Sequence, residues 1–283
     1  MTTHRDPRPV LIIGATGKTG RRVADLLAPA DVPVRRASRT SATPFDWTDR
    51  STWAPALDGT AAAYITYQPD LIVPGALDDI TELVTHADRA GVERLVLLAG
   101  RGEPEAVEAG RILHTAQADS TVLDCAWFNQ NFSEGGFADE IAAGVLTLPV
   151  GEVGEPFLDV HDIAAVAAAA LCETAADGRN PHAGRTYELT GPRLLTFADV
   201  VRELAAARGT AVTLTSVGSQ EYREYLGAFG TPNEEVDMVS NLFGTLFDGR
   251  NAHVTDDVER VLGRPPIDFA DFAASVFGVG ATR

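Results

Sequence analysis

Three glycines near the start of the chain, Gly14, Gly17 and Gly20, have the spacing of a phosphate-binding turn. They follow four consecutive apolar residues and precede apolar residues at helical spacing, so we expect a strand, a turn and a helix. In such a turn the first glycine lets the chain turn, the second lets the backbone approach a phosphate, and the third lets helix and strand pack closely. The helix N-terminus then offers N–H groups and a positive dipole end to a pyrophosphate. The stretch predicts nucleotide binding in preference to an ordinary strand–helix turn.

The end of the second expected strand indicates which nucleotide binds. NAD-binding proteins usually place an Asp or Glu there for the ribose 2′-OH, whereas this chain has Arg35, Arg36, Ser38 and Arg39 and no acid. Arg39 and Ser38 can hold a 2′-phosphate through charge-assisted hydrogen bonds; the alternative is a solvated arginine cluster. We predict NADP(H), bound by Gly14, Thr16, Gly17, Lys18, Thr19, Gly20, Ser38, Arg39, Asp46, Tyr67, Gln68 and Gly100.

Strand and helix signals alternate through the first half of the chain. Strands are expected at 10–13, 32–37, 44–45, 61–66, 95–99 and 121–125, and helices at 76–90 and 105–118. Strand–helix repeats of this length imply right-handed crossovers, so the predicted fold is α/β, a doubly wound parallel Rossmann sheet.

The rhythm changes after residue 127, where glycine and proline become frequent. An Ala-rich helix is expected at 161–173 with Asp162 as its N-cap. Further segments are expected at 187–190, 197–207 and 210–217, followed by three helical stretches. We therefore predict an NADP-binding Rossmann domain over 1–150 and a smaller, interleaved substrate lobe over 151–283.

Composition narrows the class of partner. The 283 residues carry 23 Lys+Arg against 40 Asp+Glu, a net charge of -17, which disfavours nucleic acid and anionic membranes. Cys125 and Cys172 lie in apolar surroundings and indicate reduced thiols. Neither a signal core nor a bilayer-spanning run is present, and no His/Cys/Asp cluster has metal-ligand spacing. We expect a cytoplasmic protein with a small-molecule substrate and no metal; a homodimer stays open.

Several stretches together resemble the NmrA-like atypical short-chain dehydrogenases/reductases. They are the glycine turn, Gly91-Val-Glu-Arg-Leu-Val-Leu-Leu, Trp127-Phe-Asn-Gln-Asn-Phe132 and Phe157-Leu-Asp-Val-His-Asp162. Further stretches are similar to the ergot-alkaloid branch, the festuclavine and agroclavine dehydrogenases. These are Phe45-Asp-Trp47, Arg111-Ile-Leu-His114, Gly191-Pro-Arg-Leu-Leu-Thr-Phe197, Gly249-Arg-Asn251 and Ile267-Asp-Phe-Ala270. The resemblance covers nearly the whole chain.

One part of the wider family's chemistry is missing. Relatives that reduce carbonyls use a Tyr-x-x-x-Lys pair, but the only lysine here is Lys18, inside the glycine turn. Hydride addition to an iminium carbon neutralises a cation and leaves no oxyanion to protonate, so it can proceed without that pair. The ergot-branch enzymes are understood to reduce such an iminium, and the resemblance therefore implies imine chemistry in secondary metabolism.

Loops beyond the carboxyl ends of the strands supply the expected pocket. Its predicted members are Tyr67, Arg101, Trp127, Phe128, Asn131 and Phe132, the aromatic ones suiting a planar or cationic substrate. Plain core packing is the alternative for each aromatic residue. If a proton donor is needed, His114 is the candidate, because histidine titrates near neutrality; a solvated or capping helix histidine is the alternative.

Two functions remain in view. The first is an NADPH-dependent reductase that delivers hydride to an imine or iminium, or to an activated C=C or quinone, of a small hydrophobic metabolite. The second, which the resemblance also implies, is a non-catalytic regulator that senses NADP(H).

Overall fold

The computed structural model describes residues 8–30 and 32–278, which divide into two compact units. Unit 1 takes the described residues up to Gly100 together with 104–124 and 163–187. Unit 2 takes 101–103, 125–162 and the chain from 188 onward. Each unit is thus assembled from three separate stretches.

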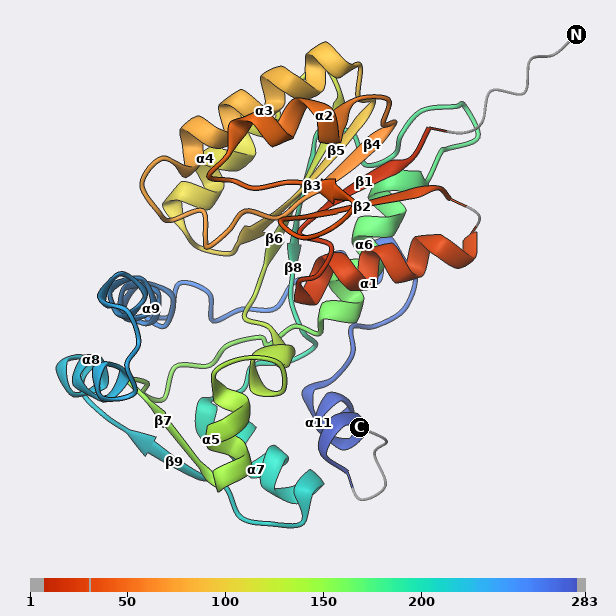
Figure 1. Cartoon of the computed structure of the whole chain (residues 1–283). Coiled ribbons are helices and arrows are strands. Elements are labelled where there is room, and N and C mark those ends of the chain that lie inside the picture. Colours follow the sequence, from red (N-terminus) through yellow and green to blue (C-terminus); the bar gives the residue numbers. More distant parts are fainter. Residues whose placement is uncertain (1–7, 31, 279–283) are drawn as a thin grey trace, which may run out of the picture. The chain divides into compact units, whose positions relative to one another are not determined.

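A seven-stranded sheet in the order β3-β2-β1-β4-β5-β6-β8 forms the core of unit 1 (Figure 1). Its strands are β1 (Val10–Ile13), β2 (Val34–Ser38), β3 (Thr43–Pro44), β4 (Ala62–Ile65), β5 (Arg94–Gly100), β6 (Asp119–Cys125) and β8 (Arg185–Leu189). β1 pairs in parallel with both β2 and β4, and β4 with β5. The chain order reverses at β1, which is where doubly wound sheets bind ligands. The predicted Rossmann fold is confirmed.

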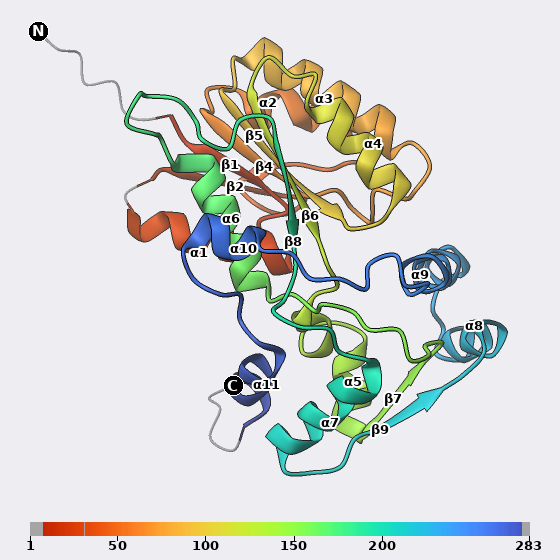
Figure 2. The same cartoon turned by 180° about the vertical axis from the view of Figure 1, so that it is seen from behind.

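Helices cover both faces of this sheet. They are α1 (Lys18–Leu27), α2 (Trp53–Leu57), α3 (Ala76–Ala90), α4 (Pro104–Leu113) and α6 (Val160–Cys172), with short 3-10 turns at Ala28–Ala30 and Arg50–Thr52. Figures 1 and 2 show α2, α3 and α4 on one face and α1 and α6 on the other. Alternate strand residues, such as Leu11 and Ile13, pack with α2, α3 and α4 in one apolar cluster.

Unit 2 holds a parallel pair of strands and several helices. Its strands are β7 (Val145–Leu148) and β9 (Thr213–Ser216). Its helices are α5 (Phe137–Ala143), α7 (Phe197–Arg208), α8 (Ser219–Ala228), α9 (Asn233–Leu246), α10 (Asp257–Leu262) and α11 (Phe269–Phe277), with a 3-10 turn at Asn129–Phe132. A separate aromatic core includes Phe132, Phe157, Phe197 and Phe269.

Local signals explain where several helices end. α3 carries Asp78 and Asp79 in its first turn and Arg89 in its last, and these charges interact favourably with the helix dipole. Gly91, in the left-handed region, is its C-cap. α7 begins with a capping box between Thr196 and Asp199. Within 8–30 and 32–278, no helix combines the length and apolar character needed to cross a membrane.

Three sequence-based expectations need correction. α4 ends at Leu113 instead of residue 118, because the chain turns there and β6 already begins at Asp119. After β9 the described chain forms four helices, α8 to α11, instead of three. Asp162 is not the N-cap of α6: Asp159 precedes the helix and accepts a hydrogen bond from the His161 N–H at 2.8 Å.

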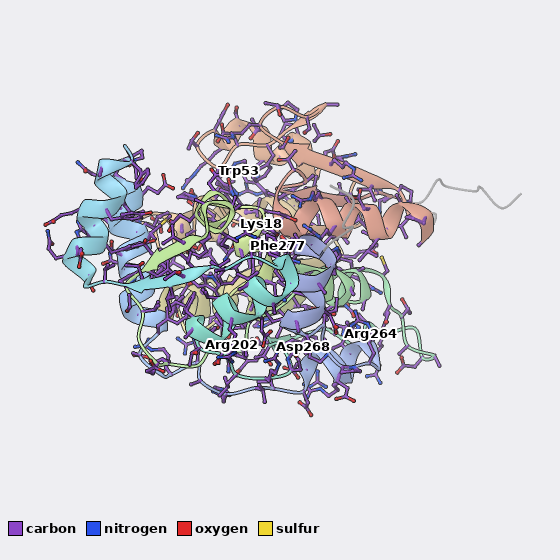
Figure 3. The ribbon with its side chains drawn as sticks, turned by 90° about the horizontal axis from the view of Figure 1, so that it is seen from below. Lys18, Trp53, Arg202, Arg264, Asp268 and Phe277 are labelled. Atoms are coloured by element: carbon purple, nitrogen blue, oxygen red, sulfur yellow. The ribbon has the colours of Figure 1, made fainter. Side chains whose placement is uncertain are left out.

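Asp162 instead joins its helix to the segment before α11. Its carboxylate accepts a hydrogen bond from the Ile267 N–H at 2.7 Å and pairs with Arg264 at 2.7 Å. The side chain of Asp162 is fully buried, and burial raises its pKa, against hydrogen bonds that lower it. Figure 3 labels Arg264.

Candidate functional site

The glycine turn between β1 and α1 has the geometry of a phosphate cradle. Gly14 lies at φ +77°, and a Cβ there would meet Thr66 Oγ1 at 2.1 Å. A Cβ on Gly20 would lie 2.3 Å from the Gly14 carbonyl oxygen, so Gly20 permits the close packing of helix on strand. At Gly17 only the Gly14 carbonyl, at 3.2 Å, comes near a Cβ, which leaves that side of the turn open for a ligand.

The N-terminus of α1 suits an anion. Gly17 is its N-cap and supplies no side-chain cap, and the first turn contains no acidic residue. Nothing in that turn therefore repels a phosphate, and the helix dipole favours one. Thr16 is exposed, Lys18 is half-buried and Thr19 is buried along this turn. The residues present fit a dinucleotide pyrophosphate.

The arginines of β2 differ in their surroundings. Arg35 donates to the Ala56 and Asp58 carbonyl oxygens, and Arg36 pairs with Asp25 at 2.6 Å. Arg39, one residue past the end of β2, is exposed, and we find no hydrogen bond or ion pair for its guanidinium among the described residues. Arg39 is therefore the candidate in this cluster for contact with a ligand.

Two neighbours complete the end of β2. The Ser38 hydroxyl is buried and lacks a hydrogen-bond partner within the described part of the chain, which a phosphate or ribose oxygen would provide. Hydrogen bonds from the Thr48 backbone and side chain lower the pKa of Asp46, and the charge of Arg39 adds to the effect. Arg39, Ser38 and Asp46 thus lie at one end of the sheet.

Beyond β4 the chain is shaped by aromatic packing. Tyr67 packs against Trp47 with ring centroids 4.5 Å apart and the rings tilted by 44°, and it donates its hydroxyl to Asp79 at 2.8 Å. Burial, with Asp79 beside it, raises the pKa of Tyr67, so this hydroxyl is a poor proton donor. Trp47 is core, and its Nε1 donates to the Thr66 carbonyl. Gln68 is exposed after β4, and Gly100 ends β5.

His114 lies at the opposite edge of the sheet. Its Nδ1 is 2.8 Å from Ser120 Oγ and its Nε2 is 3.2 Å from Thr186 Oγ1, near the beginnings of β6 and β8. A crossover helix runs antiparallel to its strands, so the residue after α4 returns to their amino ends. The glycine turn and Gly100 are at the carboxyl ends, and we withdraw His114 as a proton donor.

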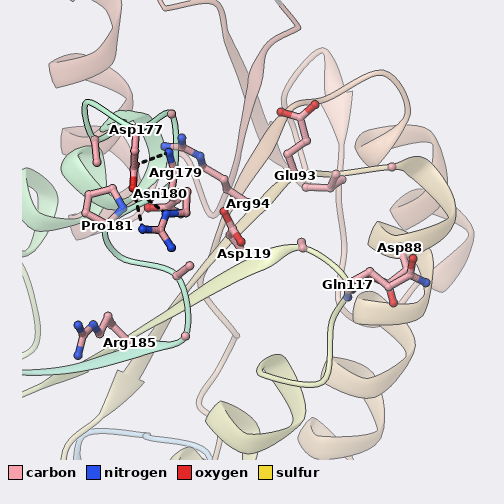
Figure 4. A pocket seen from close by; sticks show the side chains of 17 residues that line it. Asp88, Glu93, Arg94, Gln117, Asp119, Asp177, Arg179, Asn180, Pro181 and Arg185 are labelled. Carbon is pink, nitrogen blue, oxygen red and sulfur yellow. Dashed lines mark hydrogen bonds and ion pairs between the residues drawn. The ribbon is translucent and has the colours of Figure 1, made fainter.

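The same amino edge carries a hollow of about 1130 Å³ (Figure 4). Its lining includes Arg94, Asp119 and Arg185, the first residues of β5, β6 and β8. In its rim Arg179 pairs with Asp177 at 2.7 Å. This hollow is therefore distinct from the glycine turn.

In unit 2, Arg101 is the centre of a polar cluster. Its guanidinium donates to Glu188 Oε2 at 3.2 Å and to the Asn251 carbonyl at 3.0 Å, and its Nη2 lies 2.5 Å from His253 Nε2. The Asn251 amide in turn donates to the Arg101 carbonyl at 3.0 Å. Arg101 is 3 % exposed. Its contacts connect the loop after β5 to the 250–253 segment, and we do not retain it as a substrate contact.

The residues after β6 fall into two groups. Phe132 is fully buried and packs on Phe157, Phe197 and Phe269, so it is core. Trp127, Phe128 and Asn131 are half-buried. The Trp127 ring contacts Phe243 and Phe247, both at 5.3 Å. Of the pocket residues predicted in this stretch, the half-buried ones remain candidates for contact with a substrate.

Glu155 is a residue of this region that sequence reasoning missed. It is 2 % exposed, its Oε1 accepts the Trp127 N–H at 3.1 Å, and its backbone pairs with Leu195. Burial raises the pKa of Glu155 to about 7, against the Trp127 hydrogen bond and the Arg101 charge, which lower it. A Glu among glycines and Pro156 gives no burial signal in the sequence, because its partners Trp127 and Leu195 are far from it along the chain.

Within the described stretches no group of three or more His, Cys, Asp or Glu side chains is placed to hold a metal ion. No family model matches the chain. Curated proteins do match it, among them the following three. The chain is 30 % identical to the uncharacterized oxidoreductase YesF of Bacillus subtilis, with 94 % of each chain covered. It is 29 % identical to the NAD(P)H azoreductase of Xenophilus azovorans (95 % and 99 % covered) and 30 % identical to an agroclavine dehydrogenase of Claviceps purpurea (94 % and 96 %).

Solved structures share the fold. The NADPH-dependent quinone oxidoreductase QOR2 of Escherichia coli, complexed with NADPH, superposes with a TM-score of 0.78 at 22 % identity, covering 95 % of this chain and 100 % of that one. The Citrobacter triphenylmethane reductase complexed with NADP(H) gives 0.73 at 17 % identity, with 95 % and 99 % covered. NmrA, a negative transcriptional regulator, gives 0.68 at 17 % identity, with 96 % of each covered.

Proposed function

The chain belongs to the NmrA-like atypical short-chain dehydrogenases/reductases, near their ergot-alkaloid branch, and from this we propose that it reduces a conjugated C=N, C=C or quinone group of a small hydrophobic metabolite. The protein is an oxidoreductase that uses NADP(H). The observation that carries the proposal is the cradle at Gly14, Gly17 and Gly20, open on the Gly17 side.

The chain's own residues would hold the cofactor in two places. The turn and the first N–H groups of α1 would bind the pyrophosphate, with Lys18 adding a positive charge. Arg39 and Ser38 would bind the 2′-phosphate. NADPH, when bound, supplies a hydride. Trp127 would contact a planar substrate and exclude water from it.

An imine or iminium is the preferred acceptor among these groups. Because the only lysine is Lys18, no tyrosine can have its pKa lowered by a lysine four residues on. Tyr67, which follows β4, has a raised pKa instead. An acceptor that already carries positive charge needs no such acid. This supports iminium reduction, and the quinone alternative is taken up below.

The activity test is NADPH consumption with a panel of cyclic imines, N-alkyl iminium salts and quinones, followed by the near-ultraviolet absorbance of NADPH. We expect turnover with at least one class. Tight NADPH binding without turnover of any class would instead indicate an NADP(H)-sensing regulator.

The cofactor assignment has its own test in Arg39→Ala. Loss of a charged donor to the 2′-phosphate should weaken NADPH binding by about 10- to 100-fold and leave NADH binding unchanged. The matched control is Arg36→Ala, three residues earlier on β2 and paired with Asp25, which should change neither affinity. Equal losses for both nucleotides in the Arg39 variant would contradict the assignment.

Cofactor binding can be measured at Lys18 without any turnover. Reductive methylation with isotope-labelled formaldehyde keeps the charge and labels one side chain in addition to the chain's amino terminus, because Lys18 is the only lysine. NADP⁺ should shift the Lys18 methyl resonance and NAD⁺ should shift it only at much higher concentration. If neither NADP⁺ nor NAD⁺ shifts the Lys18 methyl resonance, the glycine turn does not bind the cofactor.

A further inference from the structure

Two buried polar side chains after β6 lack partners. Asn129 is fully buried, and neither the oxygen nor the nitrogen of its amide has a hydrogen-bond partner in the described chain. The Trp127 Nε1–H is buried and unpartnered in the same sense. Burying such groups without partners is costly, and native proteins nearly always satisfy them. Two such side chains within three residues call for an explanation.

Backbone pairing places these two side chains together. The Leu158 N–H donates to the Trp127 carbonyl at 2.9 Å, and the Asn129 N–H donates to the Leu158 carbonyl at 2.8 Å, so the extended residue Phe128 forms a parallel bridge with Leu158 just before the 3-10 turn that begins at Asn129. The two side chains that flank an extended residue point to the face opposite its own side chain. Trp127 and Asn129 therefore share a face, with Phe128 on the other.

Glu155 lies beside the same segment. Its carboxyl accepts the Trp127 N–H at 3.1 Å. Burial raises its pKa to about 7, so much of it is neutral at neutral pH. The nearby cation, Arg101, is already bound by Glu188 and His253. The three groups together offer hydrogen bonds and little fixed charge.

We propose that the Trp127 indole N–H and the Asn129 amide are the hydrogen-bonding groups for a heteroatom of the substrate, and that with Glu155 beside them they select an uncharged conjugated acceptor, of the quinone type, over a preformed cation. This inference rests on the proposed function and, among its acceptors, favours the quinone over the iminium that the missing Tyr-x-x-x-Lys pair by itself favours. An N–H donor pairs with a neutral carbonyl oxygen, whereas an iminium nitrogen offers no lone pair. The buried amide is then satisfied when the ligand binds.

The test uses the NADP⁺-loaded protein, in which no reduction occurs, and two probes, duroquinone and N-methyl-3,4-dihydroisoquinolinium. Asn129→Leu keeps the branched heavy-atom shape of the side chain and removes both polar atoms. Calorimetric titration should show duroquinone bound about tenfold more weakly and the iminium probe unchanged. Trp127→Phe should give a similar loss for duroquinone. Thermal unfolding of the ligand-free Asn129→Leu protein should shift upward, because the unpartnered amide is gone.

The matched control is Asn180→Leu, which also removes a buried amide whose nitrogen is unpartnered among the described residues. Asn180 caps the His182 N–H in unit 1, so its loss should lower thermal stability and leave both probes unaffected. Should Asn129→Leu not fold, Asn129→Met and Trp127→Phe carry the comparison.

Two results would overturn the inference. One is unchanged duroquinone affinity in the Asn129 and Trp127 variants. The other is a fall in thermal stability in Asn129→Leu with unchanged affinity, which would mean that a buried water satisfies the amide. Failure of the proposed function is separable: there, NADP⁺ would leave the Lys18 methyl resonance of the unmutated protein unshifted.

Discussion

The carboxyl of Glu155 ties stability to pH. Burial raises its pKa from 4.5 to about 7, so the folded chain binds this proton more tightly than the unfolded chain does. The contribution of Glu155 to the free energy of unfolding is therefore highest below about pH 4.5 and falls by up to about 3 kcal/mol as the pH rises to 7. Glu155→Gln keeps an oxygen for the Trp127 N–H and should remove this fall.

Urea unfolding of both proteins at pH 5 and pH 8 measures the difference. The free energy of unfolding of the variant should exceed that of the parent protein at pH 8 and differ little from it at pH 5. Glu152→Gln, on an exposed side chain, is the control and should leave the pH dependence as it is. A variant that follows the parent's pH curve would show that Glu155 is ionised in the folded protein throughout.

His114 should prove dispensable for turnover. Its two ring nitrogens contact Ser120 and Thr186 at the amino ends of β6 and β8, and desolvation lowers its pKa. His114→Phe should keep the rate of NADPH consumption and lose about 1 kcal/mol of stability through the missing hydrogen bonds. Steady-state kinetics and thermal unfolding check the two parts. A rate lost together with its pH dependence would restore His114 to the chemistry.

Residue roles could be predicted from the sequence where only one residue type can serve the purpose, as with the glycines of the turn. The glycine roles follow from the spacing, and Gly14 and Gly20 have the close contacts that those roles require. Prediction failed for Phe132, because an aromatic residue in a core and one in a pocket look alike in sequence. The unpartnered amide of Asn129 and the burial of Glu155 depend on contacts far along the chain, so no local pattern announces them.

At the scale of elements, two glycines of the turn have different roles: Gly20 lets α1 pack on β1, and Gly17 leaves space for a phosphate. In Gly20→Ala the new Cβ would lie 2.3 Å from the Gly14 carbonyl, so α1 must move off β1 at a cost of about 1–3 kcal/mol. In Gly17→Ala the nearest atom is 3.2 Å away and φ is -76°, which alanine adopts readily. Its methyl group would instead occupy the space a phosphate approaches.

The two variants should therefore behave differently. Gly20→Ala should lower the thermal stability of the ligand-free protein, and Gly17→Ala should leave it nearly unchanged while weakening NADPH binding. Thermal unfolding with and without NADPH separates the effects. Equal NADPH affinity in Gly17→Ala and the parent protein would place the pyrophosphate elsewhere.

Element boundaries were predictable where termination is local. β1 has its expected bounds at Val10–Ile13, and α3 has its expected bounds because Gly91 closes it. Prediction failed at the end of α4, where the chain turns to enter β6 without a glycine or proline. The cap of α6 was misassigned for a similar reason, since Asp159 and Asp162 are both plausible caps in sequence and only tertiary contacts of Asp162 with Arg264 and Ile267 distinguish them.

At the scale of the whole molecule, the chain passes between its two units five times, at residues 100/101, 103/104, 124/125, 162/163 and 187/188. The sequence suggests interleaving through its glycine-rich connections, but not these positions. They depend on which distant segments complete the sheet, β8 above all. A contiguous cut therefore cannot release either unit intact.

A fragment of residues 1–150 tests this organisation. It contains β1 to β6 but lacks β8, the neighbour of β6, and the buried apolar residues of α6, among them Ile163, Val166 and Leu171. We expect the fragment alone to show no cooperative thermal transition, and the full chain to unfold in one transition that NADPH shifts upward. Co-expression with 151–283 should restore both properties. A fragment that melts sharply by itself and binds NADPH would show that 1–150 is an independent domain.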